Sequence, residues 1–170
     1  INDSLPAPKF NVVERPNDWA KTMKAVEGLS DTKKLQLEFW QAFNDYAFSK
    51  DEFKQTFSKR KPQPQHWYDL SVGSSAYHVV LTVNTQKKFI GAEIYINDDK
   101  ELFEKFKNKK ELIESKLGIE MEWRIATKDC RILAITRGDI KKGESAWPGY
   151  YDWFCNMAIK LREIIKKYDV

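Results

Sequence analysis

The sequence predicts an α+β domain in which a mainly antiparallel sheet of about five strands packs with three long helices. Three observations predict this class. Helical periodicity appears near both ends and in the middle of the chain, period-two alternation runs through residues 67–96, and a second alternating pair follows at 121–138. The expected order is helix, three strands, helix, two strands, helix, and 170 residues suffice for one core.

Residues 1–28 are expected to form a linker or N-terminal arm, because they hold three prolines and little periodicity. The chain begins with Ile1 instead of Met, so we expect a fragment of a longer protein. A single α+β domain is then expected over residues 29–170. Its first helix is predicted at about 30–48, where the spacing of a buried stripe is kept by Leu35, Phe39, Phe43 and Tyr46.

A basic loop follows at residues 58–65, SKRKPQPQ, where two prolines interrupt regular structure. Three strands are predicted after it, at about 67–72, 76–84 and 88–96. Because one face of each strand is apolar, neighbouring strands must pair so that these faces meet in one core.

Two turns satisfy that requirement in an antiparallel meander. Gly73-Ser74 suits a type II′ turn, and Asn84–Lys87 forms a four-residue loop. The resulting register places Asp69 opposite His78 and His78 opposite Glu93, on the face away from the strongest apolar stripe.

The remaining elements are a helix, a hairpin and a last helix. The helix lies within residues 97–118, with Asp98 and Glu101 as a capping box and Gly118 as the stop. The hairpin turns at Lys128-Asp129, and the last helix runs from about 146 to 168.

The row Asp69, His78 and Glu93 has two interpretations. Such a row could bind a divalent metal or transfer protons. It could instead be an ion-pair ladder that satisfies polar groups beneath a covering helix, and this second interpretation is favoured because structural ion pairs also perturb pKa values. A serine nucleophile is excluded at Gly73-Ser74-Ser75, because a nucleophile elbow needs a second glycine.

Net charge is +4 and the pI is near 8.9, which permits an anionic partner. Cations in predicted loops and at a hairpin tip are the candidate nucleic-acid contacts: Lys59, Arg60, Lys61, Lys87, Lys88, Arg137, Lys141 and Lys142. Four aromatic residues would stack on bases if exposed, although core packing is their commoner fate: Tyr68, Trp147, Tyr150 and Tyr151.

The sequence disfavours a membrane-spanning or secreted protein. No apolar run approaches the length of a membrane span, and no signal segment opens the chain. Cys130 and Cys155 are expected to be buried free thiols in a reducing compartment, which predicts a cytoplasmic protein. A disulfide between the two is the alternative. We expect no cofactor and no metal.

The segments QHWYDLSVGSSAYHVVLTVNTQKKFIGAEIYINDDKELF, LGIEMEWRIA and PAPKFNVVERPNDWAK together resemble the domain family of unknown function numbered 4268. The resemblance covers about residues 30–168. It implies a C-terminal domain of a bacterial or archaeal protein whose N-terminal half is similar to restriction-endonuclease-like nucleases. The family offers no catalytic residues to carry over.

Three functions remain open. The preferred one is a non-catalytic accessory domain of a nuclease-like or defence-related protein that assists DNA or RNA binding. The first alternative is a nuclease-like domain, active or degenerate, but its Glu-x-Lys motif reads Glu93-Ile94-Tyr95 here and lacks the lysine. The second is a dimerisation or interaction module built on the aromatic segment 144–154, through which two copies of the chain would form a homodimer.

Overall fold

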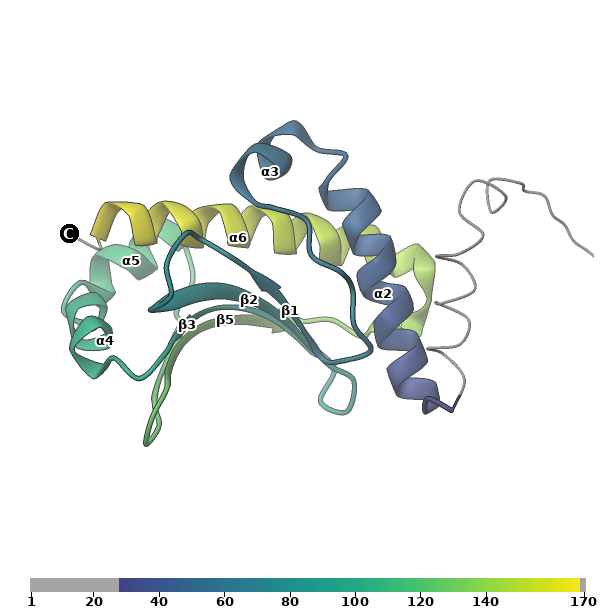
Figure 1. Ribbon diagram of the computed structural model, residues 1–170, viewed down its shortest axis with the longest axis horizontal. Coiled ribbons are helices and arrows are strands. Elements are labelled where there is room, and N and C mark those ends of the chain that lie inside the picture. The colour runs from purple at the N-terminus through teal and green to yellow at the C-terminus, as the bar shows by residue number, and fades with distance from the viewer. Residues whose placement is uncertain (1–27, 169–170) are drawn as a thin grey trace, which may run out of the picture.

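The computed structural model describes residues 28–168 and forms two layers, a curved antiparallel sheet and helices packed on one of its faces (Figure 1). Among these residues the sheet has five strands in the order β1-β2-β3-β5-β4. The strands are β1 (Trp67–Leu70), β2 (Tyr77–Asn84), β3 (Phe89–Ile96), β4 (Glu122–Ile125) and β5 (Cys130–Arg137). The predicted α+β class is therefore confirmed. The expected arm at residues 1–28 lies almost wholly outside the described residues.

The helices lie before, between and after the strands. They are α2 (Asp31–Ala47), α3 (Asp51–Thr56), α4 (Lys100–Lys107), α5 (Lys110–Leu117) and α6 (Trp147–Tyr168), with short 3-10 turns η2 (Ile140–Lys142) and η3 (Glu144–Ala146). No helix in residues 28–168 is long and apolar enough to cross a membrane.

The core lies between the sheet and the two longest helices. Phe39 and Trp40 of α2 meet Phe154 of α6 with ring centroids 6.2 and 5.7 Å away. These rings cover the buried alternate residues of the strands, such as Leu81 and Ile94. The apolar stripe predicted in the first helix is thus confirmed, because aromatic side chains bury large areas when packed edge to face.

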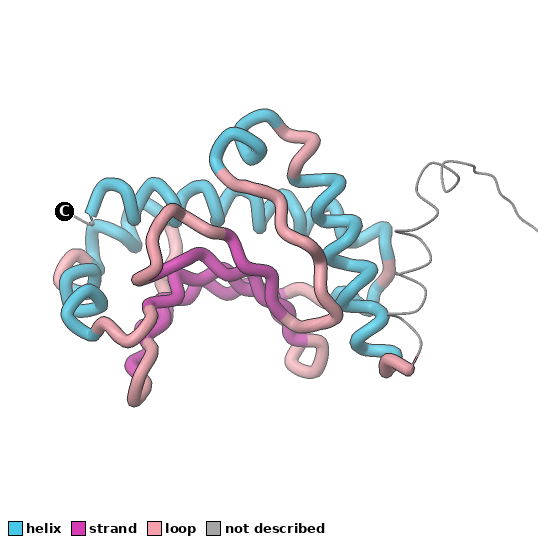
Figure 2. Tube along the Cα trace, viewed as in Figure 1, coloured by secondary structure: helices cyan, strands magenta, loops and turns pink. Residues whose placement is uncertain are grey.

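The other face of the sheet curves away from α6, and Figure 2 shows the strands as an arch that opens on that side. Within residues 28–168 no helix packs across it (Figures 1 and 2). We call it the concave face; its side chains include those of Trp67, Asp69, His78, Val80, Thr82, Glu93, Tyr95, Arg131, Leu133 and Arg137. The fold therefore leaves one sheet surface available for contacts.

The register differs by two residues from the predicted one at both turns. Asp69 is opposite Val80 instead of His78, and His78 is opposite Tyr95 instead of Glu93. The predicted two-residue turn at Gly73-Ser74 was wrong, since pairing ends at Leu70 and leaves a longer loop. Alternation fixes the face of a side chain but is unchanged by a shift of two residues, so the predicted face was right and the partners were wrong.

The β2–β3 loop explains the second shift. It keeps the predicted four residues but occupies 85–88 instead of 84–87, because Asn84 is the last paired residue of its strand. The Asn84 side-chain oxygen accepts hydrogen bonds from the backbone N–H groups of Gln86 and Lys87 at 3.1 and 2.8 Å. Lys88 completes the turn with a positive φ of 60°.

The second predicted helix is divided into α4 and α5 at Asn108-Lys109. The predicted N-cap of α4 was also wrong by one residue. Asp99, not Asp98, is the N-cap, and its carboxylate accepts from the Leu102 N–H at 2.9 Å. Gly118 ends α5 in the left-handed conformation as predicted.

The hairpin between β4 and β5 is confirmed, but its turn is centred on Thr127-Lys128 instead of Lys128-Asp129, because Ile125 is opposite Cys130 and the Ala126 N–H donates to the Asp129 carbonyl at 3.1 Å. Cys130 and Cys155 are buried free thiols, as expected. Burial raises the pKa of the Cys155 thiol to about 11, so it stays protonated near neutral pH.

Buried polar groups hold the loop between α3 and β1 against the core. The Asn44 amide donates to the Arg60 carbonyl at 2.9 Å, and the Tyr68 hydroxyl donates to the Asn44 side-chain oxygen. The Trp40 indole N–H donates to the Gln65 carbonyl at 2.9 Å. This network fixes where the basic loop leaves α3 and enters the sheet.

Replacing Asn44 with Ala should lower the free energy of unfolding by about 1–3 kcal/mol, because the buried Tyr68 hydroxyl loses a partner and so does the Arg60 carbonyl. Urea unfolding followed by circular dichroism measures this decrease. Asn156→Ala, at an exposed position of α6, is the matched control and should stay within about 0.5 kcal/mol. Equal effects of the two substitutions would contradict the role of the network.

Candidate functional site

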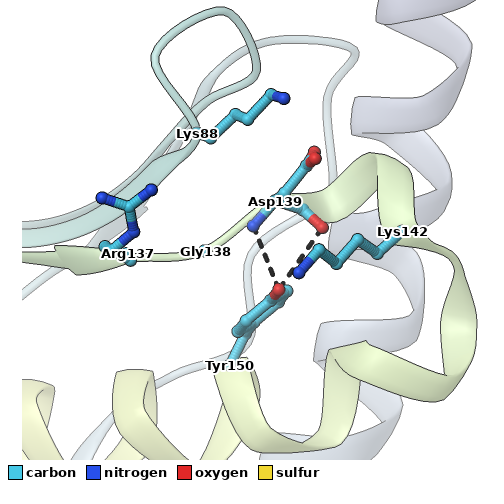
Figure 3. A pocket seen from close by; sticks show the side chains of 6 residues that line it. All are labelled: Lys88, Arg137, Gly138, Asp139, Lys142 and Tyr150. Atoms are coloured by element: carbon cyan, nitrogen blue, oxygen red, sulfur yellow. Dashed lines mark hydrogen bonds between the residues drawn. The ribbon is translucent and has the colours of Figure 1, made fainter.

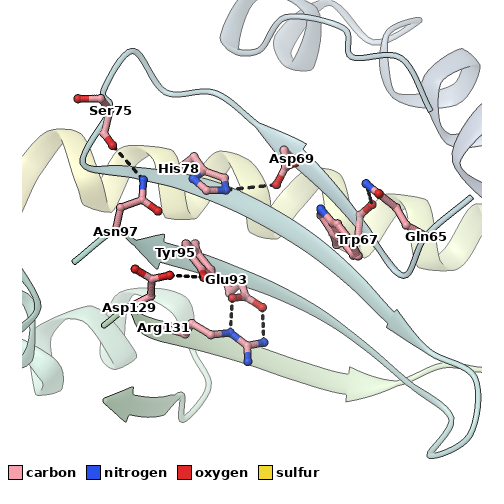
Figure 4. A network of polar contacts seen from close by, with 10 residues as sticks. All are labelled: Gln65, Trp67, Asp69, Ser75, His78, Glu93, Tyr95, Asn97, Asp129 and Arg131. Carbon is pink, nitrogen blue, oxygen red and sulfur yellow. Dashed lines mark hydrogen bonds and ion pairs between the residues drawn. The ribbon is translucent and has the colours of Figure 1, made fainter. Parts of the chain in front are cut away.

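The concave face holds a hollow of about 460 Å³ near the middle of β1, β2 and β3 (Figure 4). Aromatic, polar and apolar side chains line it: His66, Trp67, Asp69, His78, Val80, Thr82, Glu93, Tyr95 and Arg131. Its volume lies within the range of ordinary ligand sites. We call it the central hollow.

The strand register arranges these residues in three rows across the sheet. Val80 forms the floor in the middle row, between Asp69 and Glu93. One neighbouring row holds His78 opposite Tyr95, whose ring centroids are 5.3 Å apart. On the other side of the floor Trp67 lies opposite Thr82, so rings stand at both ends of the hollow.

Glu93 forms the strongest ion pair of the site. Arg131 donates from Nε and Nη2 to the two carboxylate oxygens at 2.6 and 2.7 Å. The Glu93 side chain is 2% exposed and that of Arg131 is 37% exposed. Because the carboxylate is buried, it needs this bidentate partner, and the pairing raises the pKa of Arg131.

Asp69 and His78 form a second pair, with Asp69 Oδ1 and His78 Nε2 3.2 Å apart. They touch although they are not directly opposed, because diagonal neighbours on one sheet face lie within reach of long side chains. The hydrogen bond from His78 lowers the pKa of Asp69, and partial burial opposes this. The charge of Arg60 adds to the lowering, which places that arginine near the rim.

The predicted row Asp69, His78 and Glu93 thus shares one face but divides into two pairs. Glu93 is held by Arg131 on β5, and Asp69 is held by His78 (Figure 4). In residues 28–168 no three His, Cys, Asp or Glu side chains gather in the manner of a metal site. Both carboxylates are in ion pairs, but the predicted ladder was wrong in detail, because His78 does not stand between them and no helix of residues 28–168 covers them.

A third polar contact was missed by the sequence analysis. The Tyr95 hydroxyl donates to Asp129 Oδ2 at 2.6 Å, and the Asp98 N–H donates to Asp129 Oδ1 at 3.0 Å. The tyrosine hydrogen bond lowers the pKa of Asp129 and raises that of Tyr95. It holds the Tyr95 ring beside the hollow. The aspartate of the hairpin turn was visible in the sequence, but its distance from Tyr95 was not.

A second hollow, of about 300 Å³, lies at the end of the sheet (Figure 3). Lys88 comes from the β2–β3 loop, Arg137 from the end of β5 and Lys142 from η2, and Gly138, Asp139 and Tyr150 complete the lining. The Asp139 N–H donates to the Tyr150 hydroxyl at 3.0 Å, which ties this loop to α6. We call Lys88, Arg137 and Lys142 the terminal cation cluster.

This cluster brings together three of the predicted nucleic-acid contacts. Within the described part of the chain none of its three side chains forms an ion pair, and all three are exposed. The carboxylate of Asp139 is the counter-charge in its lining, and it accepts from the backbone of Lys141. Opposed strands bring Arg137 and the loop together, because Arg137 lies opposite Phe89.

Four of the other predicted cations lie beside these two hollows, and Lys59 does not. Arg60 and Lys61 line a smaller hollow of about 160 Å³ that shares Trp67 and Asp69 with the central one. Lys59 lies over the Phe48 ring at 5.8 Å. Lys87 and Lys141 are exposed neighbours of the terminal cation cluster.

The four predicted aromatic residues mostly serve the core. Tyr68, Trp147 and Tyr151 are buried, and Tyr150 is half-buried at the second hollow. Trp67, at 36% exposed, is the ring that the sequence analysis passed over. Strand alternation already placed Trp67 on the same sheet face as Asp69, so the sequence could have identified this ring as a site residue.

Fold and site together define an α+β domain with a polar, aromatic sheet face and a cationic end. A family model for the domain of unknown function DUF4268 matches residues 35–169, so the chain belongs to this family. A search of curated proteins found no significant match. A search of solved structures likewise found none.

The Asp69–His78 pair should contribute stability that depends on pH. The pKa of Asp69 in the folded protein is below its usual 3.8, so its contribution is present above pH 3.8 and is lost as pH falls through the folded value. Urea unfolding at several pH values should therefore give a difference between wild type and Asp69→Asn that shrinks below pH 3.8. A difference that is constant from pH 6 to acid would contradict the pairing.

Arg131→Leu should destabilise the fold by about 2–3 kcal/mol, because it leaves the buried Glu93 carboxylate unpaired. This loss of stability is smaller than is usual when a fully buried ion pair is broken, because Arg131 is partly exposed. The double variant Arg131→Leu/Glu93→Leu should recover most of this stability, because no charge remains buried. Thermal unfolding of both variants checks this, and additive effects of the two substitutions would contradict it.

Proposed function

We propose that this domain is a non-catalytic accessory domain that binds nucleic acid. It would serve a nuclease-like or defence-related protein, with an N-terminal nuclease-like domain in the same parent chain and a cytoplasmic location. The observation that carries the binding proposal is the terminal cation cluster. Two segments distant in sequence, the β2–β3 loop and residues 137–142, bring Lys88, Arg137 and Lys142 to one hollow without an ion-pair partner among the described residues.

The arrangement of charge supports contacts with a phosphate backbone. Lysine and arginine side chains neutralise phosphates and release condensed counterions, which supplies affinity without sequence preference. Arg60 and Lys61 lie at the β1 edge of the concave face, beside Trp67 and Asp69, whereas the terminal cation cluster lies where β3 begins and β5 ends. A bound strand could therefore meet cations at two separated points of the same surface.

The nuclease alternative has weaker support from the site. A metal-dependent nuclease needs acidic ligands and a lysine near the scissile phosphate. Glu93 is occupied by Arg131, and Tyr95 stands where the motif requires lysine. The chemistry of these residues favours binding without cleavage.

The interaction module keeps one observation in its favour. An apolar hollow of about 390 Å³ lies between α2 and the start of α6, lined by residues that include Tyr46, Trp147 and Tyr151. Burial of most of the aromatic segment 144–154 in the core weakens this candidate. Light scattering coupled to gel filtration would support it if the domain were dimeric at micromolar concentration.

Replacing the terminal cation cluster with alanines should weaken binding of a fluorescein-labelled oligonucleotide in anisotropy titrations. The slope of log affinity against log salt should flatten by about 0.7–0.9 for each phosphate that the variant no longer neutralises. The matched control replaces three exposed helix lysines, Lys34, Lys160 and Lys166, and changes net charge equally. A second variant, with Lys59, Arg60 and Lys61 replaced, should also flatten the slope.

Two results would contradict the proposed function. One is the absence of binding to DNA and RNA at low salt. The other is an equal decrease in affinity for the cluster variant and the helix-lysine control, because affinity would then depend on net charge alone.

A further inference from the structure

We propose that the central hollow takes an unpaired nucleobase, so that the domain prefers single-stranded over double-stranded nucleic acid. The inference rests on the proposed function and adds the part of the ligand that the concave face selects. It follows from three features of the described residues: the exposed ring of Trp67 with the half-buried ring of Tyr95, the paired carboxylates, and the position of the cations on the same face.

The rings give the hollow its stacking surfaces. Trp67 is 36% exposed on one side of the Val80 floor. Tyr95 stands on the other side, with its hydroxyl tied to Asp129 at 2.6 Å. Stacking on aromatic rings binds bases of any sequence, because every base has a π face. A tyrosine whose hydroxyl is already engaged offers its ring in a fixed orientation.

The charges of the hollow favour a base over a phosphate. Asp69 and Glu93 place two carboxylates beside the floor, and each is paired. The charges of His78 and Arg131 are therefore already engaged and attract a phosphate less than the unpaired cations of the terminal cation cluster do. Their partners His78 and Arg131 hold these carboxylates in place. The partly exposed Asp69 oxygen can accept from a base N–H group, and the guanidinium N–H groups of Arg131 that do not bind Glu93 can donate to a base carbonyl.

The cations lie where the backbone of such a strand would run. Arg131 at the hollow and Arg137 at the terminal cation cluster are on the same face of β5, about 20 Å apart at roughly 3.3 Å per residue. Arg60 and Lys61 border Trp67 at the β1 edge, and the terminal cation cluster lies where β3 begins and β5 ends, on the same side of the Val80 floor as Trp67. Phosphates on that side would therefore meet cations across the sheet while a base stacks in the hollow beside them. A duplex cannot present a base in this way, because its bases are paired and stacked.

The experiment compares a short fluorescein-labelled single-stranded oligodeoxynucleotide with its duplex in anisotropy titrations. Trp67→Ala and Tyr95→Leu should each weaken single-strand binding roughly tenfold and leave duplex binding unchanged. Tyr95→Phe keeps the ring and removes only the hydroxyl, so it should retain single-strand affinity. Leu112→Ala, at a 59% exposed position of α5, is the control for substitution of an apolar surface residue. Circular dichroism confirms that each variant is folded.

A second measurement makes the hollow testable apart from the phosphate contacts. Uncharged nucleosides at millimolar concentration should shift the Trp67 indole resonance in NMR spectra, which a Trp67→Phe spectrum assigns. If the ring variants bind single strands as wild type does while the cluster variant binds weakly, the hollow proposal is wrong and the proposed function stands. If no oligonucleotide binds, the proposed function fails, and the nucleoside titration alone decides: a saturable shift upholds the base site and no shift overturns it.

Discussion

The packing of α6 on one face of a curved sheet is the constraint on which the other features depend. Alternate strand residues on that face, such as Leu81 and Ile94, are buried beneath α2 and α6. The opposite residues of the same strands then have to tolerate water, because no described helix covers them (Figure 1). Hydrophobic burial of about 25 cal/mol per Å² drives this division, and strand alternation transmits it to every residue of the concave face.

The curvature of the sheet also affects how deeply side chains on the concave face are buried. Side chains on the inside of an arch crowd together, so Val80, Glu93 and Leu133 are buried although they face away from the core. A carboxylate in that position must be paired, and the bidentate contact from Arg131 supplies the partner. The middle of the concave face therefore combines an apolar floor with paired charges, and the cations of the terminal cation cluster lie at one end of the sheet. A nucleic-acid strand likewise combines negatively charged phosphates with aromatic bases.

The sequence predicted the faces of the strands and missed their partners. Alternation assigned Asp69, His78 and Glu93 to one surface correctly, because face depends only on whether a residue is odd or even within its strand. The loop between β2 and β3 moved by one residue when Asn84 joined the strand, and that shift displaced every β2–β3 pair by two. Local preference did not distinguish these loops, since either position gives Asn84 a side-chain oxygen near the turn. The meeting of Lys88, Arg137 and Lys142 depends on the β3–β5 pairing, and no local pattern encodes that pairing.

The same shift of two residues changes the chemistry that the carboxylates can perform. In the predicted register His78 would stand between Asp69 and Glu93 and could join them in binding a cation. In the observed register Tyr95 takes the place opposite His78, and Glu93 is drawn to Arg131 on the neighbouring strand β5. A metal ion at Glu93 would have to displace a guanidinium that makes two charge-assisted hydrogen bonds, and would leave that arginine without its partner. The carboxylates that suggest catalysis in the sequence are thus engaged in holding the sheet surface, and what they leave available to a ligand is shape, aromatic rings and a few hydrogen-bonding atoms.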